Sequence, residues 1–384
     1  RQALVANTTA VENVAVGYAT LAANTTGTLN VALGSRALDA NSTGSANTAV
    51  GYNALGACTT DGNTAVGKDA LELCTTGVNT AVGGNALAAV TTGTGNTAMG
   101  QDALTVNTAS NNTGIGKSAL AANTTGAANV AVGGNALQAN TTAAENTVMG
   151  YAAMYTNTTG GANTAVGTDA LYSNTTGDYN VAVGKGALDA NTTADNNTAI
   201  GLAALGANTT GAGNTAMGSG ALDANTTGGD SVAIGLDALT ANTEASNNVA
   251  VGSGALAANT TGTGNIAMGR NALIANTTAN YNTAIGHGAG AAVTTGAQNT
   301  LVGMQAGDAI TTGSNNVIMG ISCDVGSGGV GNAMVMGDSV TGVGGNNFTF
   351  GNGTLDTNIE MGTTTISTPS DVRLKEDIQD EEVG

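Results

Sequence analysis

The chain is short of the residues from which large globular cores are built. Its 384 residues include one proline, no tryptophan and only 2% aromatic residues. A globular protein of this length would need two or three cores filled with bulky side chains, and this composition does not supply them. No apolar run approaches the ~20 residues of a membrane-spanning helix, so we expect no membrane span. The first residues, RQALVANTTA, also lack the layout of a signal peptide.

Basic residues are scarce as well. Eight lysine and arginine residues stand against 26 aspartate and glutamate residues, which gives a net charge of −18. A protein that follows a phosphate backbone needs a stripe of basic side chains, and the sequence shows none. We therefore expect no nucleic-acid partner.

Residues for catalysis or metal binding are few. The only histidine, His287, follows Gly286 at a variable position, which indicates a surface side chain. The repeats contain no combination of nucleophile, histidine and acid. Acidic residues such as Asp39, Asp69 and Glu72 change place from unit to unit, so they form no regular metal ladder. We expect no cofactor, no metal and no enzymatic activity in the repeats.

Glycine, in contrast, is abundant and regularly spaced. Twenty glycines from Gly17 to Gly337 follow one another at intervals of 17 residues, with three intervals of 16. Each unit reads approximately NTAVGxxALxANTTGxx, and self-similarity at a fixed period predicts a stack of identical small units. A unit of 17 residues is too short for a helix pair, and its threonine and valine favour strands, so we expect two short strands per unit. The sequence predicts an all-β fold, a parallel β-solenoid of about twenty 17-residue rungs over residues 1–340.

The alternation along the predicted strand assigns its residues to two faces. A bulky apolar residue precedes each glycine, as Val16, Val50 and Met149 do, and we expect this row to be buried. The alanine before it, such as Ala49, would then face outward. A leucine four residues after each glycine, such as Leu38, forms a second core row. Because so thin a solenoid with an outward alanine row is best stabilised by identical copies around a shared axis, we predict a homotrimer.

The first asparagine of the ANTTG sequence has informative replacements. At equivalent positions the chain has Cys58, Cys74 and Val90, and a position that accepts cysteine and valine points inward. We therefore predict a buried ladder of asparagines whose amides bond to one another along the stack. Its members include Asn24, Asn41, Asn107, Asn123, Asn140, Asn157 and Asn174. Burial excludes glycosylation of the NTT sequences. Adjacent rungs would allow a disulfide between Cys58 and Cys74, but the odd number of cysteines and Val90 on the next rung favour free buried thiols.

Tyrosines gather in one part of the array. Tyr155 and Tyr172 occupy the same variable position on consecutive rungs, and Tyr151 and Tyr179 are close to them in sequence. We expect the four rings to cluster on one outward patch, which could bind the sugar rings of a receptor. The alternative, which we favour, is an exposed aromatic ladder that only supports stacking.

The repeats resemble a known architecture. The NTAVG strand and the alanine-rich segment after it are similar, over roughly residues 3–340, to the head repeats of trimeric autotransporter adhesins. The resemblance implies a left-handed parallel β-roll that assembles as a trimer. Those heads usually carry Ser-Val-Ala-Ile-Gly on shorter units, whereas this chain has the longer ALxANTTG return, which allows a different cross-section.

The end of the chain resembles another family. After a Gly- and Thr-rich terminal β segment over residues 341–369, the chain reads SDVRLKEDIQD from Ser370. This stretch is similar to the opening of the intramolecular chaperone domain at the end of endosialidases and of many phage tail fibres and tailspikes. The resemblance implies a self-cleavage junction at which Ser370 attacks the backbone and Lys375 acts with it. The alternative is a charged helix start with Ser370 as its N-cap. Residues 370–384 are too few for the whole chaperone domain, so we expect a truncated copy.

Together these resemblances imply a structural trimeric shaft of a viral (phage) tail fibre or tailspike, which presents host-attachment surfaces and matures by self-cleavage of its chaperone. The expected partners are further copies of the chain, a host cell-surface receptor that could be a glycan, and upstream virion or fibre components. The last expectation follows because the array begins in mid-repeat, at Ala3 and Leu4. The expected location is the virion tail fibre or an extracellular surface.

Two other functions stay open. A cell-anchored bacterial trimeric adhesin head fits the repeats equally well, and only the SDVRLK stretch favours the fibre. An ice- or surface-binding solenoid would use a row formed by one threonine of each TT pair. Adjacent threonines such as Thr25 and Thr26 cannot both face outward from one strand, which disfavours this function.

Overall fold

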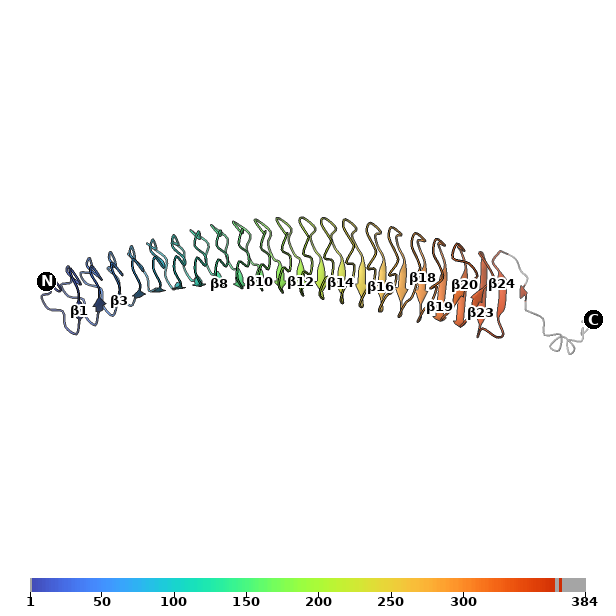
Figure 1. Cartoon of the computed structure of the whole chain (residues 1–384), viewed down its shortest axis with the longest axis horizontal. Coiled ribbons are helices and arrows are strands. Elements are labelled where there is room, and N and C mark those ends of the chain that lie inside the picture. The colour runs from blue at the N-terminus through green and yellow to red at the C-terminus, as the bar shows by residue number, and fades with distance from the viewer. Residues whose placement is uncertain (1, 363–365, 368–384) are drawn as a thin grey trace, which may run out of the picture. The chain divides into compact units, whose positions relative to one another are not determined.

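A computed structural model describes residues 2–362 and 366–367 of the chain. These residues form β-strands and turns and contain no helix. The chain divides into two compact units, Arg1–Ser219 (unit 1) and Gly220–Gly384 (unit 2). Figure 1 shows successive turns of the chain lying side by side within each unit.

Unit 1 is a ladder of three-residue strands. Each strand pairs with the next in parallel and in register, so that Val14 lies beside Val31 and Val31 beside Thr48. The strands are β1 (Val14–Val16), β2 (Val31–Leu33), β3 (Thr48–Val50), β4 (Thr64–Val66), β5 (Thr80–Val82), β6 (Thr97–Met99), β7 (Thr113–Ile115), β8 (Val130–Val132), β9 (Thr147–Met149), β10 (Thr164–Val166), β11 (Val181–Val183), β12 (Thr198–Ile200) and β13 (Thr215–Met217). Consecutive strands start 16 or 17 residues apart, which confirms the predicted parallel β-solenoid with one repeat per turn.

Unit 2 continues this pattern and then departs from it. Its strands are β14 (Val232–Ile234), β15 (Val249–Val251), β16 (Ile266–Met268), β17 (Thr283–Ile285), β18 (Thr300–Val302), β19 (Val317–Ile321), β20 (Asp324–Val325), β21 (Met334–Asp338), β22 (Thr341–Gly342), β23 (Asn347–Gly351), β24 (Thr357–Glu360) and β25 (Ile366–Ser367). β20 and β22 form a small second sheet. β23 still pairs in parallel with β21, but β24 runs antiparallel to β23 and β25 antiparallel to β24. Parallel pairing therefore extends past residue 340, where the array was predicted to end.

Each turn from β1 to β18 contains one strand, so the prediction of a second strand per unit is wrong there; among the described turns, a short second strand is present only in those of β19 and β21, as β20 and β22. In the segment after the glycine, called the return here, the backbone passes through the left-handed region at residues such as Leu21 (φ 48°) and Leu38 (φ 53°). A left-handed residue cannot belong to an extended strand. The return still bonds between turns, because the Leu21 N–H donates to the Ala37 carbonyl at 3.0 Å. A left-handed leucine costs about 1–2 kcal/mol, and full burial of its side chain contributes about 2–3 kcal/mol, so burial outweighs the strain.

The glycine at each corner is required by its surroundings. Gly17 has φ +140°, a conformation that other residues rarely adopt. A Cβ atom placed there would lie 2.6 Å from the Gly34 carbonyl oxygen of the next turn. The close stacking of turns therefore excludes any side chain at this corner, which explains the regular glycine interval.

The interior of each turn is filled by leucine and alanine, and the predicted orientation of the strand is wrong. Leu38 and Ala49 are fully buried, whereas Val16 is 55% exposed and Met149 is 47% exposed. The return brings a leucine against the strand, which leaves room for little more than a methyl group. At Gly114, a Cβ atom would already lie 3.2 Å from Leu104 Cγ. The middle residue of each three-residue strand, which is alanine in most, therefore faces the interior, and the residues on either side of it face outward.

Candidate functional site

The asparagines of ANTTG lie in the interior and form a hydrogen-bonded ladder. Asn174 is fully buried. Its amide donates to Asn157 Oδ1 at 2.9 Å and to the Gly177 carbonyl at 3.0 Å. The other predicted ladder residues, Asn24, Asn41, Asn107, Asn123, Asn140 and Asn157, are buried as well. These side chains hold the backbone of the return in place and are not accessible to a ligand.

A second ladder of asparagines escaped the sequence analysis. From β2 to β19 the asparagine immediately before the strand is buried, and its side-chain oxygen typically accepts the backbone N–H of its counterpart one turn on. Asn47 N–H, for example, donates to Asn30 Oδ1 at 3.0 Å. The signal in the sequence was the near invariance of asparagine at this position, where Ser231 is an exception. Invariance alone, without an apolar replacement, gives no indication of burial.

The cysteines of the first ladder are free and buried. Asn63 lies between them and donates its amide to Cys58 Sγ at 3.6 Å. The hydrogen bond with Cys58 and burial both raise the pKa of Cys74, which keeps it a thiol. The same hydrogen bond lowers the pKa of Cys58 to about 7. The two cysteines take the place of ladder asparagines in the buried interior.

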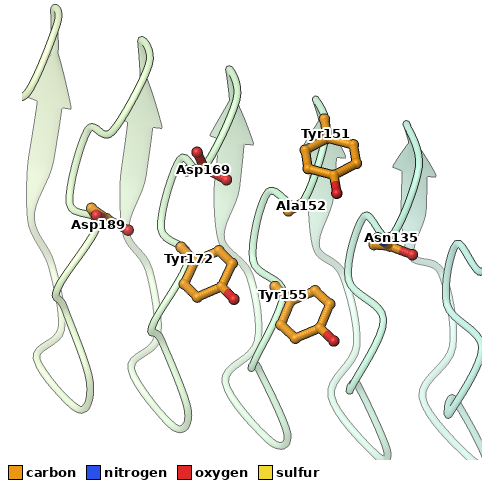
Figure 2. A pocket seen from close by; sticks show the side chains of 7 residues that line it. All are labelled: Asn135, Tyr151, Ala152, Tyr155, Asp169, Tyr172 and Asp189. Atoms are coloured by element: carbon orange, nitrogen blue, oxygen red, sulfur yellow. The ribbon is translucent and has the colours of Figure 1, made fainter.

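Three of the four predicted tyrosines line one depression on unit 1, the tyrosine hollow. The rings of Tyr155 and Tyr172 come from consecutive turns and are stacked, with centroids 5.3 Å apart and planes 4° from parallel. Figure 2 shows their hydroxyl groups pointing the same way and Tyr151 above them, on the turn that carries Tyr155. The hollow has a volume of about 460 Å³. Its lining consists of Asn135, Tyr151, Ala152, Tyr155, Asp169, Tyr172 and Asp189.

The hollow lies where a small residue stands between two polar residues in a column of equivalent positions. Asn135, Ala152 and Asp169 occupy the same position, two residues after the corner glycine, on three consecutive turns. Ala152 lacks the polar side chain that its two neighbours carry, so its turn leaves a gap between them (Figure 2). The tyrosines close the gap on the side of the return.

The electrostatics of the hollow are acidic. Asp169 and Asp189 both line it, and no lysine, arginine or histidine does. Burial, together with the nearby carboxylate of Asp169, raises the pKa of Asp189. The hollow therefore offers carboxylate and phenol oxygens to a ligand and disfavours an anionic one.

Tyr179 lies elsewhere. Its ring is 64% exposed and lines a different depression, together with Glu145 and Asp178. It belongs to the column that follows TTG, whereas Tyr155 and Tyr172 belong to the column that follows the buried leucine or methionine. The structure thus brings together Tyr151, Tyr155 and Tyr172 and separates Tyr179 from them.

The strands present a second surface feature, an outward apolar face. Its main row consists of the residues before the corner glycines, which pair in register from strand to strand. In unit 1 this row is Val16, Leu33, Val50, Val66, Val82, Met99, Ile115, Val132, Met149, Val166, Val183, Ile200 and Met217. The other outward residue of the strand is threonine in most turns, such as Thr48, Thr147 and Thr164. At a spacing of ~4.8 Å between strands, the apolar row of unit 1 runs for roughly 60 Å. We call it the apolar face.

The predicted self-cleavage residues Ser370 and Lys375 lie outside the described residues.

The histidine, His287, lies at the surface, where its Nε2 is 2.8 Å from Arg270 Nη2. Within residues 2–362 and 366–367 no three His, Cys, Asp or Glu side chains are grouped closely enough to hold a metal ion. The same residues include no helix of the length and hydropathy needed to cross a membrane.

Comparison of the chain with models of known protein families gives no match, and comparison with curated proteins gives none either.

Proposed function

We propose that the chain is the structural shaft of a trimeric fibre, assembled through the apolar face. The observation that carries this proposal is the row of valine, leucine, isoleucine and methionine before the corner glycines, which faces outward and is exposed or half-buried in every strand from β1 to β13. A strip of bulky apolar side chains on a flat sheet stabilises the fold only when another surface covers it. Copies of the same chain present a matching strip with the same spacing between turns.

The energetics favour a long interface over a short one. Burying a half-exposed valine, isoleucine or methionine contributes about 1 kcal/mol. Over the thirteen strands of unit 1 this amounts to roughly 13 kcal/mol for each chain, against an association cost of about 4–15 kcal/mol. A few turns would therefore not hold chains together, whereas the whole ladder would.

The trimeric state, the left-handed winding and the viral context come from resemblance. The repeats are similar to trimeric autotransporter heads, and the SDVRLK stretch is similar to the chaperone junction of phage tail fibres and tailspikes. The shaft would belong to a virion tail fibre or an extracellular surface and would present host-attachment surfaces. Its maturation would use Ser370 and Lys375, so Ser370→Ala in the full gene product should leave the chain uncut while trimers still form.

Sedimentation tests the assembly. The wild-type chain should have a mass three times that of the 36.7 kDa monomer. The double variant Met99→Asp, Met149→Asp places charges on the apolar face and should dissociate. A matched control, Leu73→Asp, Val106→Asp, changes similarly exposed apolar residues of the return and should stay trimeric. A wild-type monomer would refute the proposal, and a wild-type dimer would keep the interface but refute the trimer.

The alternatives are less well supported. A bacterial adhesin head would use the same apolar face, and it differs only in what the flanking sequence encodes. For an ice-binding surface, the first threonine of each pair is already engaged, since Thr175 Oγ1 donates to the Thr192 carbonyl at 2.9 Å. Only the second, such as the exposed Thr176, faces outward, and a single row is narrow for binding a crystal surface.

A further inference from the structure

We propose that the tyrosine hollow of unit 1 binds one neutral pyranose ring of a glycan. The proposal rests on the host-attachment role for its biological meaning. The site itself lies within one chain and does not require the trimer.

The polar groups of the hollow lack partners within the described part of the chain. Elsewhere in the column of Ala152, asparagine and aspartate on adjacent turns bond to each other, as Asn53 Nδ2 does to Asp69 Oδ1 at 3.1 Å. Asn85 Nδ2 bonds in the same way to Asp102 Oδ1 at 2.9 Å. Ala152 separates Asn135 from Asp169 by a full extra turn, so this bond is not made. One amide and one carboxylate are left facing the gap.

The tyrosines supply the complementary part of a sugar site. A pyranose ring has an apolar C–H face and a rim of hydroxyl groups, and an aromatic ring packs well against such a face. Tyr151 is 60% exposed and lies apart from the stacked pair, so its ring is available for this contact. The hydroxyl groups of Tyr155 and Tyr172 point the same way, so they can donate to or accept from one ligand.

Charge selects the class of sugar. Carboxylates of Asp169 and Asp189 accept hydrogen bonds from sugar hydroxyl groups, but they repel the carboxylate of a sialic or uronic acid. The volume of about 460 Å³ lies within the usual range of small-molecule sites. A neutral hexose or an N-acetylhexosamine fits this chemistry.

Saturation-transfer NMR tests the proposal with four monovalent probes. Each probe is the methyl β-pyranoside of one sugar: glucose, galactose and N-acetylglucosamine are the neutral sugars, and N-acetylneuraminic acid is the charged one. At least one neutral probe should receive saturation from the wild-type chain, and N-acetylneuraminic acid should receive none. Tyr151→Ala should weaken binding of the neutral probe about tenfold. Tyr179→Ala, a tyrosine outside the hollow, should leave binding unchanged.

A filling variant separates binding from folding. Ala152→Asn introduces the residue that the same column already has at Asn53, Asn85 and Asn135, all at positive φ like Ala152. It should fill the hollow and abolish binding, while the midpoint of thermal unfolding stays the same. Absence of transfer from every neutral probe, or undiminished transfer in Ala152→Asn, would overturn the proposal. Stronger transfer to N-acetylneuraminic acid than to the neutral sugars would overturn it too.

Sedimentation of the same samples keeps this proposal distinct from that of the shaft. A trimer that binds none of the neutral sugars refutes the sugar site alone. A monomer that binds one of them refutes the trimeric shaft alone.

Discussion

Most turns of unit 1 and the turns around β18 in unit 2 differ in which element supplies the large side chain of the interior. In most of unit 1 the strand contributes an alanine and the return contributes a leucine, as Ala182 and Leu188 do. At β18 the strand contributes Leu301, and the return has Gly290 on the preceding turn and Gly307 on its own. A Cβ atom at Gly290 would lie 2.6 Å from Leu301 Cδ1, and one at Gly307 would lie 2.7 Å from Leu301 Cδ2. The interior volume of a turn is therefore fixed, while the element that fills it can change.

This comparison also shows how the strand orientation can be recognised. A leucine at the alanine position is compatible with the stack only when the facing leucines are lost, so the two positions share one core. The bulky residues before the glycines show no such exchange with the return, in agreement with their outward orientation.

The largest expected effect comes from reproducing the exchange in unit 1. Replacing Leu171 and Leu188 by glycine should destabilise the fold by about 2–5 kcal/mol for each cavity. Adding Ala182→Leu to this double variant should restore part of the loss, because the new side chain occupies both cavities. Urea unfolding followed by circular dichroism measures the change.

The control is the same substitution in the wild-type background. Ala182→Leu alone should destabilise by about 1–3 kcal/mol through overpacking. The effect of one substitution thus changes sign with its background. Equal destabilisation in both backgrounds would show that residue 182 and the two leucines do not share a core.

A smaller effect is expected in the asparagine ladder, where Val90 and Val293 already replace asparagine. Asn174→Asp removes two donated hydrogen bonds and turns a carboxylate toward carbonyl oxygens, which should cost about 3–5 kcal/mol. Asn174→Val loses the same hydrogen bonds without burying a charge and should cost about 1–2 kcal/mol. Unfolding midpoints of both variants measured at pH 7 compare the two. Equal midpoints would contradict a buried ladder.

The sequence was sufficient for the period, the parallel solenoid and the first ladder, because these depend on spacing and on replacements between copies. Cys58 and Val90 stand at asparagine positions, and these replacements indicated that the asparagine side chains of this column are buried. It was insufficient for the strand orientation, because both faces of a Thr-Ala-Val strand are compatible with a core and alternation cannot choose between them. The narrow interior determines that alanine, and not valine, faces inward. This narrow interior results from the left-handed backbone of the return, which no residue pattern predicted.

The tyrosine hollow was predictable only in part. Equal positions in consecutive units predicted that Tyr155 and Tyr172 would be neighbours, and their rings are stacked. The place of Tyr179 depended on which side of the turn its column faces, which spacing alone does not give. The gap at Ala152 depended on a missing side chain between Asn135 and Asp169, which becomes visible only when turns are stacked.

The smallest effect concerns pH and again contrasts the two units. Asp324 occupies the leucine position of its turn in unit 2, four residues after Gly320. Its carboxylate accepts the backbone N–H groups of Ala309 at 2.6 Å and Val325 at 2.7 Å, which favour the charged form. Burial outweighs them and, with Asp308 adding to its effect, raises the pKa of Asp324 to about 6.

Because the folded pKa lies above the ordinary value of 3.8, the folded chain binds this proton more tightly than the unfolded chain does. Stability contributed by the protonated group is therefore present below about pH 4 and is lost as the pH rises to about 6. Allowing for solvent screening of a half-buried group, the loss should be about 1 kcal/mol. Unfolding midpoints at pH 4, 5, 6 and 7 measure it. The variant Asp324→Asn keeps the shape of the side chain and should flatten the profile between pH 4 and 6. An unchanged slope in Asp324→Asn would assign the pH dependence to other carboxylates and show that an acid at the leucine position is tolerated without cost.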